Sequence, residues 1–140
     1  MLKHIPPLLT PDALFALASM GHGDELALVD ANFPAARLAA ARGARLVPLP
    51  GADAPAVLAL LPLDDFGAEA AWTMQVVGDA AAVPPPVAEF RAVLRDGGER
   101  EPATLERAAF YERATAAFAI LQCGERRRYG NLLLRKGVLD

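Results

Sequence analysis

The residue with the clearest chemical potential is His22, in the segment Met20-Gly21-His22-Gly23-Asp24. The flanking glycines allow close backbone packing and leave the imidazole accessible. Histidine transfers protons readily near neutral pH, and either Asp24 or Asp30 would supply a carboxylate that orients it. His22 is therefore a candidate general acid or base. The competing interpretation is a histidine at the end of a helix, where the helix dipole favours it.

A second polar group, Tyr129-Gly130-Asn131, precedes the last apolar run of the sequence. Its tyrosine and asparagine offer hydrogen-bond donors and acceptors without charge, which suits a neutral ligand rich in hydroxyl groups. The alternative is an ordinary turn that leads into a strand. The neighbouring run Arg126-Arg127-Arg128 is interpreted as a solvated turn.

Asp30 and Arg107 are two further candidates for the same site. Asp30 directly follows the apolar run Leu26–Val29, and ligands of open α/β sheets gather beyond the carboxyl ends of the strands. Aspartate also ends strands and starts turns for purely structural reasons. Arg107 either faces the site or pairs with a glutamate on its own helix, and the sequence alone leaves both open.

Several classes of site are excluded by composition and spacing. The glycines around His22 lack the spacing and the lysine of a phosphate-binding loop. Ser19 is the only serine, and no nucleophile-elbow motif surrounds it. Two histidines and the single Cys123 cannot build a typical zinc site, and the apolar residues before Cys123 predict a buried thiol. We therefore expect neither a metal nor a cofactor.

The bulk properties of the sequence narrow the range of partners. The net charge of −3 makes nucleic acid an unfavourable partner. The longest apolar run, residues 54–63, is far shorter than the roughly 20 residues of a membrane span, and early prolines interrupt any signal peptide. We expect a soluble cytoplasmic protein without a membrane partner. The hydrophobic fraction of 54% suggests apolar surface buried between subunits, although many of these residues are alanine.

Short apolar runs alternate with helical patterns along the chain. Thr10 and Pro11 begin the first helix and Gly21 ends it. Further helices are expected after Asn32-Phe33-Pro34, after Asp53, after Pro84-Pro85-Pro86 and over residues 105–114, and strands over residues 26–29, 45–49, 72–77, 116–121 and 132–134. A tight polar turn around Gly124 would join the last two strands. This alternation predicts an α/β layered fold, with a largely parallel sheet flanked by helices and one domain over residues 1–140.

Taken together, the segments resemble one family, the small sugar mutarotases that include L-fucose mutarotase and D-ribose pyranase. The stretches that carry the resemblance are Leu2–Leu9, Met20–Glu25, Asp30–Pro34, Phe110–Ala114, Gly124–Glu125 and Tyr129–Val138. It spans nearly the whole chain, and residues 51–100 are the least distinctive part. Within the family, Gly23 and Asn32-Phe33-Pro34 are similar to the L-fucose type.

The resemblance implies a role for each candidate residue. His22 corresponds to the proton donor, and the substrate-binding positions are Asp30, Arg107, Tyr129, Gly130 and Asn131, with Gly130 contributing backbone. It also implies a small neutral sugar as ligand and a ring-like homo-oligomer with sites near the subunit contacts. A decamer is one assembly compatible with this.

The implied reaction suits these residues. Mutarotation opens and closes a cyclic hemiacetal, so one group protonates the ring oxygen while another removes the anomeric proton. General acid–base catalysis contributes about 10²- to 10⁴-fold to such a step. Tyr129 is one candidate for the second proton-transfer group. Three alternatives stay open: pyranose–furanose interconversion of the D-ribose pyranase type, a non-catalytic sugar-binding protein on the same scaffold, and a purely structural assembly subunit.

Overall fold

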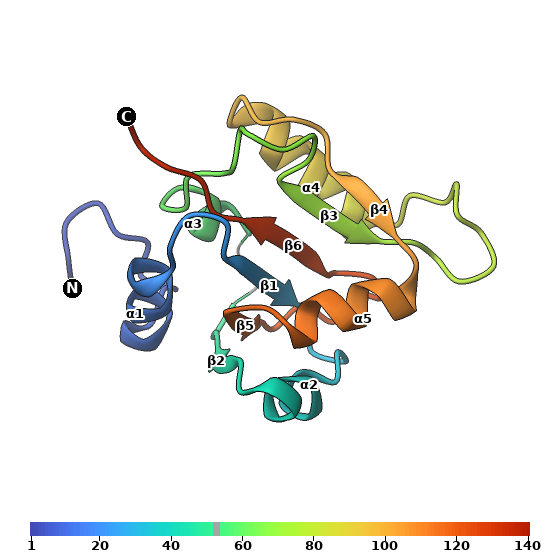
Figure 1. Ribbon diagram of the computed structural model, residues 1–140, viewed down its shortest axis with the longest axis horizontal. Coiled ribbons are helices and arrows are strands. Elements are labelled where there is room, and N and C mark those ends of the chain that lie inside the picture. Colours follow the sequence, from blue (N-terminus) through green and yellow to red (C-terminus); the bar gives the residue numbers. More distant parts are fainter. Residues whose placement is uncertain (52–53) are drawn as a thin grey trace.

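The computed structural model describes residues 1–51 and 54–140 and contains a central six-stranded sheet covered by helices (Figure 1). The strands are β1 (Glu25–Val29), β2 (Arg45–Pro48), β3 (Ala71–Met74), β4 (Ala103–Leu105), β5 (Ala119–Gln122) and β6 (Leu132–Arg135). The helices are α1 (Pro11–Ser19), α2 (Ala35–Arg42), α3 (Ala54–Leu58), α4 (Pro85–Asp96) and α5 (Arg107–Thr115). No helix in these described ranges is both long enough and apolar enough to cross a membrane.

The strand order in the sheet is β2-β5-β1-β6-β3-β4. The pairs β2–β5, β5–β1 and β3–β4 are parallel, whereas β6 runs antiparallel to both β1 and β3. The predicted α/β layered fold with a largely parallel sheet is therefore confirmed. The strand β6 forms the antiparallel exception, and it lies next to β1 in the middle of the sheet.

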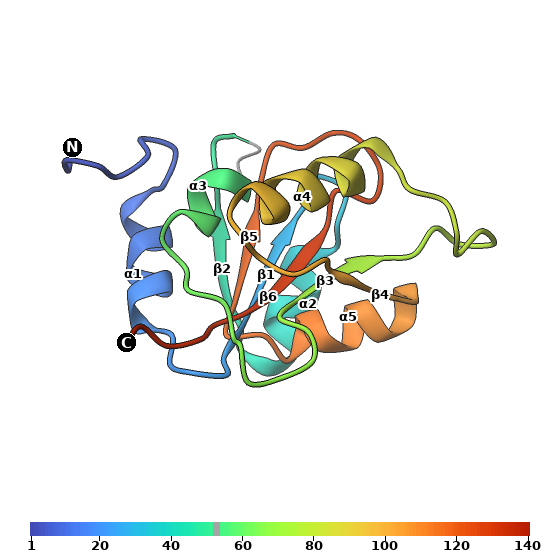
Figure 2. The ribbon, with the colours of Figure 1, turned by 90° about the horizontal axis from the view of Figure 1, so that it is seen from above.

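Apolar side chains on both faces of β1 explain why this strand is central. Leu26 and Leu28 contribute to the core beneath α1, α3 and α4, while Ala27 and Val29 contribute to the core beneath α2 and α5. Figure 2 shows α3 and α4 on one side of the sheet and α2 and α5 on the other. These four side chains are almost completely buried, as they must be in a strand covered on both faces.

The prediction of a tight turn between the last two strands is wrong. The strand β1 lies between β5 and β6, so the connection over residues 123–131 has to cross the carboxyl end of β1 instead of forming a hairpin. The reason is that β1 needs neighbours on both sides, and β5 and β6 supply them. This crossing brings the residues after β5 next to Asp30.

Several predicted element boundaries shift by a few residues. Thr10 caps α1 by accepting a hydrogen bond from the backbone N–H of Ala13, but the helix ends at Ser19, before the predicted stop at Gly21. Gly43 ends α2 in the left-handed conformation that favours glycine. Leu105, predicted to be helical, belongs instead to the short edge strand β4. Asp53, the predicted cap of α3, lies outside the described residues.

Candidate functional site

A pocket of about 340 Å³ opens beyond the carboxyl end of β1, and we call it the carboxyl-end pocket. Its lining residues are Asp30, Asn32, Phe33, Met74, Arg107, Tyr111, Arg128, Tyr129 and Asn131. Four predicted site residues, Asp30, Arg107, Tyr129 and Asn131, are thus brought together. They come from segments up to about a hundred residues apart, which the crossing connection and the start of α5 gather at one end of the sheet.

Asp30 and Asn131 form the buried polar floor of this pocket. The backbone N–H of Asp30 donates to Oδ1 of Asn131 over 2.9 Å, and the backbone N–H of Asn32 donates to Oδ1 of Asp30 over 3.0 Å. The antiparallel pairing of β1 with β6 sets Leu28 opposite Leu132, so the residues just beyond them meet as neighbours. Both side chains are therefore fixed before any ligand arrives.

Burial controls the ionisation of Asp30. Desolvation raises the pKa of its carboxyl above the ordinary value, while hydrogen bonds from the backbone N–H groups of Asn32 and Gly130 oppose the rise. The same burial lowers the local dielectric, so a hydrogen bond from a ligand hydroxyl group to this carboxylate is stronger than it would be in water. An aspartate with a raised pKa in a pocket is also suited to proton transfer.

Tyr129 adopts a backbone conformation that is uncommon for a residue other than glycine, with a φ of 65°. Its hydroxyl oxygen accepts a hydrogen bond of 3.1 Å from the backbone N–H of Val77, in the loop between β3 and α4. This contact ties the residue to a second loop beside the pocket. Backbone strain of this kind is found preferentially at functional sites.

Gly130 makes the close approach that the connection needs beside the pocket. A Cβ atom at this position would lie 2.5 Å from Cγ of Glu125 and 3.4 Å from Cβ of Asp30. The carboxylate of Glu125 is itself held by Arg127, so the side chain cannot move away freely. Only glycine fits here without displacing Glu125, and both residues line a neighbouring pocket and not the carboxyl-end pocket itself.

Gly130→Ala is expected to destabilise the protein by about 1–3 kcal/mol, because the added methyl group overlaps Glu125. Thermal denaturation followed by circular dichroism measures the effect. Gly124→Ala is the matched control, since its added Cβ would meet its nearest atom at 3.8 Å, an ordinary contact. Equal melting temperatures for the two variants would contradict the steric argument.

The remaining wall of the pocket mixes charge with apolar surface. Arg107 is the first residue of α5 and has no ion-pair partner among the described residues, so of the two predicted arrangements the structure has the one that faces the pocket. Tyr111 lies one helical turn further on and packs edge-on against Phe33, with ring centroids 5.2 Å apart. Met74 ends β3 at the same wall. The sequence analysis did not identify Tyr111 or Met74 as site residues. The available signal for Tyr111 was its position four residues after Arg107, which puts both side chains on one face of a helix.

His22 lies at the opposite end of β1, away from the carboxyl-end pocket. It sits in the loop between α1 and β1, where the backbone N–H of Gly23 donates to the carbonyl of Lys136. A five-residue strand is about 17 Å long, so the backbones of His22 and Asp30 lie at opposite ends of a strand of that length within one chain. Within one copy of the chain, Asp30 therefore does not orient His22.

The carboxylate that faces His22 belongs to Asp64. Nε2 of His22 lies 3.3 Å from Oδ1 of Asp64, and the imidazole ring packs against Phe66 at a centroid distance of 5.2 Å. The other predicted partner, Asp24, is occupied locally, since its Oδ2 accepts a hydrogen bond from the backbone N–H of Gly21. The sequence held no local signal for this pair because 42 residues separate its members.

The surroundings of Asp64 fix its charge and its position. A hydrogen bond from the backbone N–H of Phe66 and the contact with His22 hold the pKa of the Asp64 carboxyl below its ordinary value. Arg100 donates to the backbone carbonyls of Asp64, Gly67 and Ala68 and so braces the loop that carries the carboxylate. An ionised Asp64 can only accept, so Nε2 of His22 carries the hydrogen and Nδ1 is left free for another proton.

Exposed apolar side chains surround His22. A hollow of about 640 Å³ beside it is lined mainly by leucines and by the residues around 136–139. Phe66 is 76% exposed and Leu139 is 84% exposed. We call the group Leu2, His22, Phe66, Val138 and Leu139 the His22 patch. An apolar patch around a polar residue is typical of surfaces that contact another protein.

Comparison with known proteins places the whole chain in one family. The model of the RbsD / FucU transport protein family matches residues 3–139. The chain is 44% identical to the fucose mutarotase of Homo sapiens, over 99% of this chain and 94% of that protein. It is 41% identical to the fucose mutarotase of Bos taurus, over 99% of this chain and 95% of that protein.

Solved structures agree with this placement. The fucose mutarotase of Streptococcus pneumoniae, in complex with L-fucose, superposes with a TM-score of 0.88 at 36% identity and covers 99% of this chain and 100% of that one. RbsD of Bacillus subtilis, in complex with D-ribose, has the same fold with a TM-score of 0.74 at 23% identity, over the full length of both chains. With its sheet, its full-length matches and its family model in agreement, this chain belongs to the RbsD / FucU family.

Proposed function

We propose that this chain is a mutarotase that interconverts the α and β anomers of L-fucose by general acid–base catalysis. The observation that carries the proposal is the carboxyl-end pocket, where buried Asp30 and Asn131 meet Tyr129 and Arg107 in a space suited to one monosaccharide. Relatives that are 40–44% identical over nearly the full length carry the name fucose mutarotase. We assign sugar binding to Asp30, Arg107, Tyr129 and Asn131, and a backbone contact to Gly130.

The character of the pocket wall supports L-fucose over D-ribose. L-Fucose is a 6-deoxy sugar, so it presents a methyl group where related sugars present a hydroxymethyl group. Met74, Phe33 and Tyr111 offer an apolar wall opposite the polar floor of Asp30 and Asn131. A site that combines an apolar wall with a few fixed polar groups orients such a ligand in one way.

His22 supplies the first proton transfer in this proposal. Asp64 holds Nε2 and stabilises the imidazolium, so Nδ1 donates a proton to the ring oxygen and later recovers one. The second group comes from the carboxyl-end pocket, where the carboxyl of Asp30 and the hydroxyl of Tyr129 are available. Neither a redox step nor a covalent intermediate is needed for the hemiacetal to open and close.

We infer that a complete site forms between two copies of the chain. A monosaccharide is much shorter than the strand that separates His22 from Asp30, so it cannot touch both in one copy. The exposed His22 patch is suited to contact a neighbour and would carry His22 to that neighbour's carboxyl-end pocket. A ring-like homo-oligomer, with a decamer as one candidate, repeats this contact around the assembly.

The remaining features fit a single enzyme unit. We propose that residues 1–140 form one mutarotase domain, because both cores pack against the same sheet. We also place the enzyme in the cytoplasm. Cys123 is a free, buried cysteine, and burial raises the pKa of its thiol, which keeps it unreactive and is compatible with a reducing compartment.

Anomer exchange measured for a panel of sugars tests the proposal. We expect faster exchange between the anomers of L-fucose than of D-galactose, and little effect on D-ribose. Faster pyranose–furanose exchange of D-ribose alone would instead support the D-ribose pyranase type of activity. Saturable binding of a sugar without faster anomer exchange would identify a sugar-binding protein. If the chain neither binds a sugar nor accelerates exchange, the alternative of a structural assembly subunit is supported.

Asp30→Asn is expected to separate stability from function. The raised pKa of Asp30 means that ionisation costs folding stability, and this cost appears as the pH rises above the ordinary carboxyl pKa of 3.8. The variant should therefore melt at a higher temperature than the parent at pH 7, with the difference vanishing near about pH 3, where both side chains are neutral. Its kcat/KM for L-fucose should fall about 10- to 100-fold, because a charged hydrogen-bond acceptor is lost.

Calorimetry at the two pH values and anomer-exchange kinetics measure the two effects of Asp30→Asn. A variant that is less stable than the parent at pH 7 would contradict the burial argument. Unchanged kinetics would remove Asp30 from the sugar site.

A further inference from the structure

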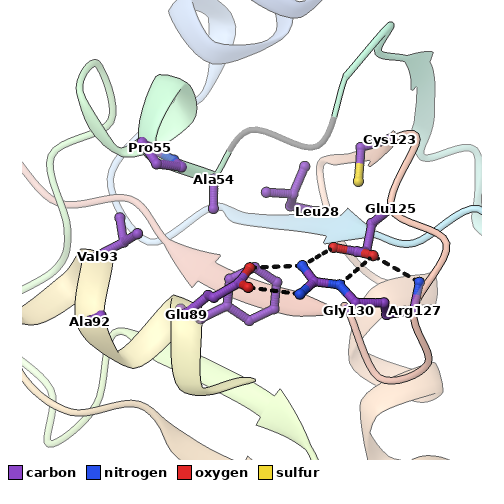
Figure 3. Close-up of a pocket in the computed structure, with 11 residues that line it drawn as sticks. Leu28, Ala54, Pro55, Glu89, Ala92, Val93, Cys123, Glu125, Arg127 and Gly130 are labelled. Carbon is purple, nitrogen blue, oxygen red and sulfur yellow. Dashed lines mark hydrogen bonds and ion pairs between the residues drawn. The ribbon is translucent and has the colours of Figure 1, made fainter. Parts of the chain in front are cut away.

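Arg127 forms a charged bridge between α4 and the connection that leads to the carboxyl-end pocket. Its guanidinium donates two hydrogen bonds of 2.7 Å to the carboxylate of Glu89 on α4. It also donates to Glu125, through Nε over 3.0 Å and through an amino group over 2.7 Å. Figure 3 shows the guanidinium held between the two carboxylates, at the edge of a neighbouring apolar pocket. The run Arg126-Arg127-Arg128 is exposed and turned, as predicted, and Arg127 in addition pairs with two carboxylates.

The electrostatics match this geometry. Hydrogen bonds from Arg127 are the largest cause that lowers the pKa of both Glu89 and Glu125 below the ordinary value. Both carboxylates are consequently ionised at neutral pH, and the planar guanidinium binds them in the two-pronged way that a lysine cannot reproduce.

Glu125 connects the Arg127 bridge to the residues that we propose bind the sugar. Its backbone carbonyl accepts a hydrogen bond of 2.8 Å from the N–H of Ala31, directly after Asp30. Its Cγ lies against the position where Gly130 has no Cβ, directly before Asn131. Glu125 is nearly buried, with 12% of its side chain exposed, whereas Glu89 is 59% exposed. The bridge thus runs from an exposed helix to the floor of the pocket.

We propose that Arg127 is a positioning residue for sugar binding, an inference that rests on the proposed function. By tying the connection to α4, it holds Tyr129, Gly130 and Asn131 in the conformation that the sugar requires. The connection over residues 123–131 is irregular and contains the strained backbone of Tyr129, so without the bridge it samples other conformations. Ordering it before the sugar arrives removes part of the entropy cost of binding.

If Arg127 served only to stabilise the fold, its loss would lower thermal stability and kcat together. Arg127 and Glu89 are each about half exposed, and ion pairs of this kind add little to global stability. Removing the bridge should therefore weaken sugar binding while leaving the rest of the fold and the chemistry at His22 unchanged.

Arg127→Met is expected to raise the KM for L-fucose about three- to fivefold, while kcat stays within about twofold. Glu89→Gln should also raise KM, and the double variant should be no worse than Arg127→Met alone, because the contact with Glu89 is already lost in that variant. Arg127→Lys should recover part of the loss. Arg126→Met is the matched control, with a neighbouring arginine removed and no ion pair lost in the described part of the chain.

Hydrogen exchange gives a readout that does not depend on activity. In Arg127→Met, the amides of residues 126–131 should exchange several-fold faster than in Arg126→Met, with the sheet unchanged. Unchanged exchange there, or a KM equal to that of the control, would overturn the proposal, as would parallel losses of kcat and thermal stability. If the parent protein does not accelerate L-fucose exchange at all, the proposed function fails, and hydrogen exchange alone decides whether Arg127 positions the connection.

Discussion

Replacing His22 with asparagine is expected to lower kcat for L-fucose anomer exchange by about 10²- to 10⁴-fold, the usual contribution of general acid–base catalysis. Asparagine keeps a polar side chain of similar size beside Asp64 but cannot take up and return a proton near neutral pH. KM should change little, since sugar binding is assigned to the carboxyl-end pocket. Exchange rates from saturation-transfer NMR over a range of L-fucose concentrations give both constants.

The chain contains its own control for this experiment. His4, the only other histidine, is exposed and has a φ of 62°, a conformation that asparagine tolerates well. His4→Asn should therefore match the parent in rate. Asp64→Asn should fall between the parent and His22→Asn, because the imidazole stays but loses its anionic partner. A kcat for His22→Asn within about threefold of the parent would remove His22 from the mechanism.

Mixed oligomers of two impaired variants are expected to regain activity. If each site takes His22 from one copy and Asp30 from another, oligomers built only from His22→Asn copies or only from Asp30→Asn copies each lose most of their activity. In a random one-to-one assembly, both wild-type residues meet in about a quarter of the sites. Activity should therefore rise to about a quarter of that of the parent, well above either variant alone.

Co-expression with two different affinity tags, followed by purification on both, yields the mixed assemblies. The separately purified variants, combined without subunit exchange, form the control, and their activity should stay at the average of the two variants. If the mixed assemblies are no more active than the average of the two variants, each site lies within one copy. The separation of His22 from Asp30 would then have to be bridged by a rearrangement of the chain.

Much of the fold followed from local patterns in the sequence. The cap at Thr10, the stop at Gly43 and the proline-led start of α4 each depend on backbone chemistry within a few residues. The order of the strands could not be predicted in this way. The last two strands are near neighbours in the sequence, yet β1 separates them because its two apolar faces need cover from both sides.

Part of the candidate site was also predictable from the sequence, where the residues carry a local signal. Asp30 at a strand end, and Gly130 beside it, follow from local sequence and family resemblance. Asp64 became visible only in three dimensions, because an ordinary aspartate after Pro62-Leu63 carries no mark of its contact with His22. The separation of His22 from Asp30 was available in principle, since a five-residue strand between them already spans about 17 Å.

Interconversion of the anomers of L-fucose is measured with the unmodified protein and L-fucose itself. The anomeric proton of the α form is saturated by irradiation, and the intensity of the β signal is recorded at increasing protein concentrations. We expect a loss of β intensity that grows with protein concentration and is strongly reduced with His22→Asn. A β signal that stays at its protein-free intensity at every concentration would contradict the proposed function.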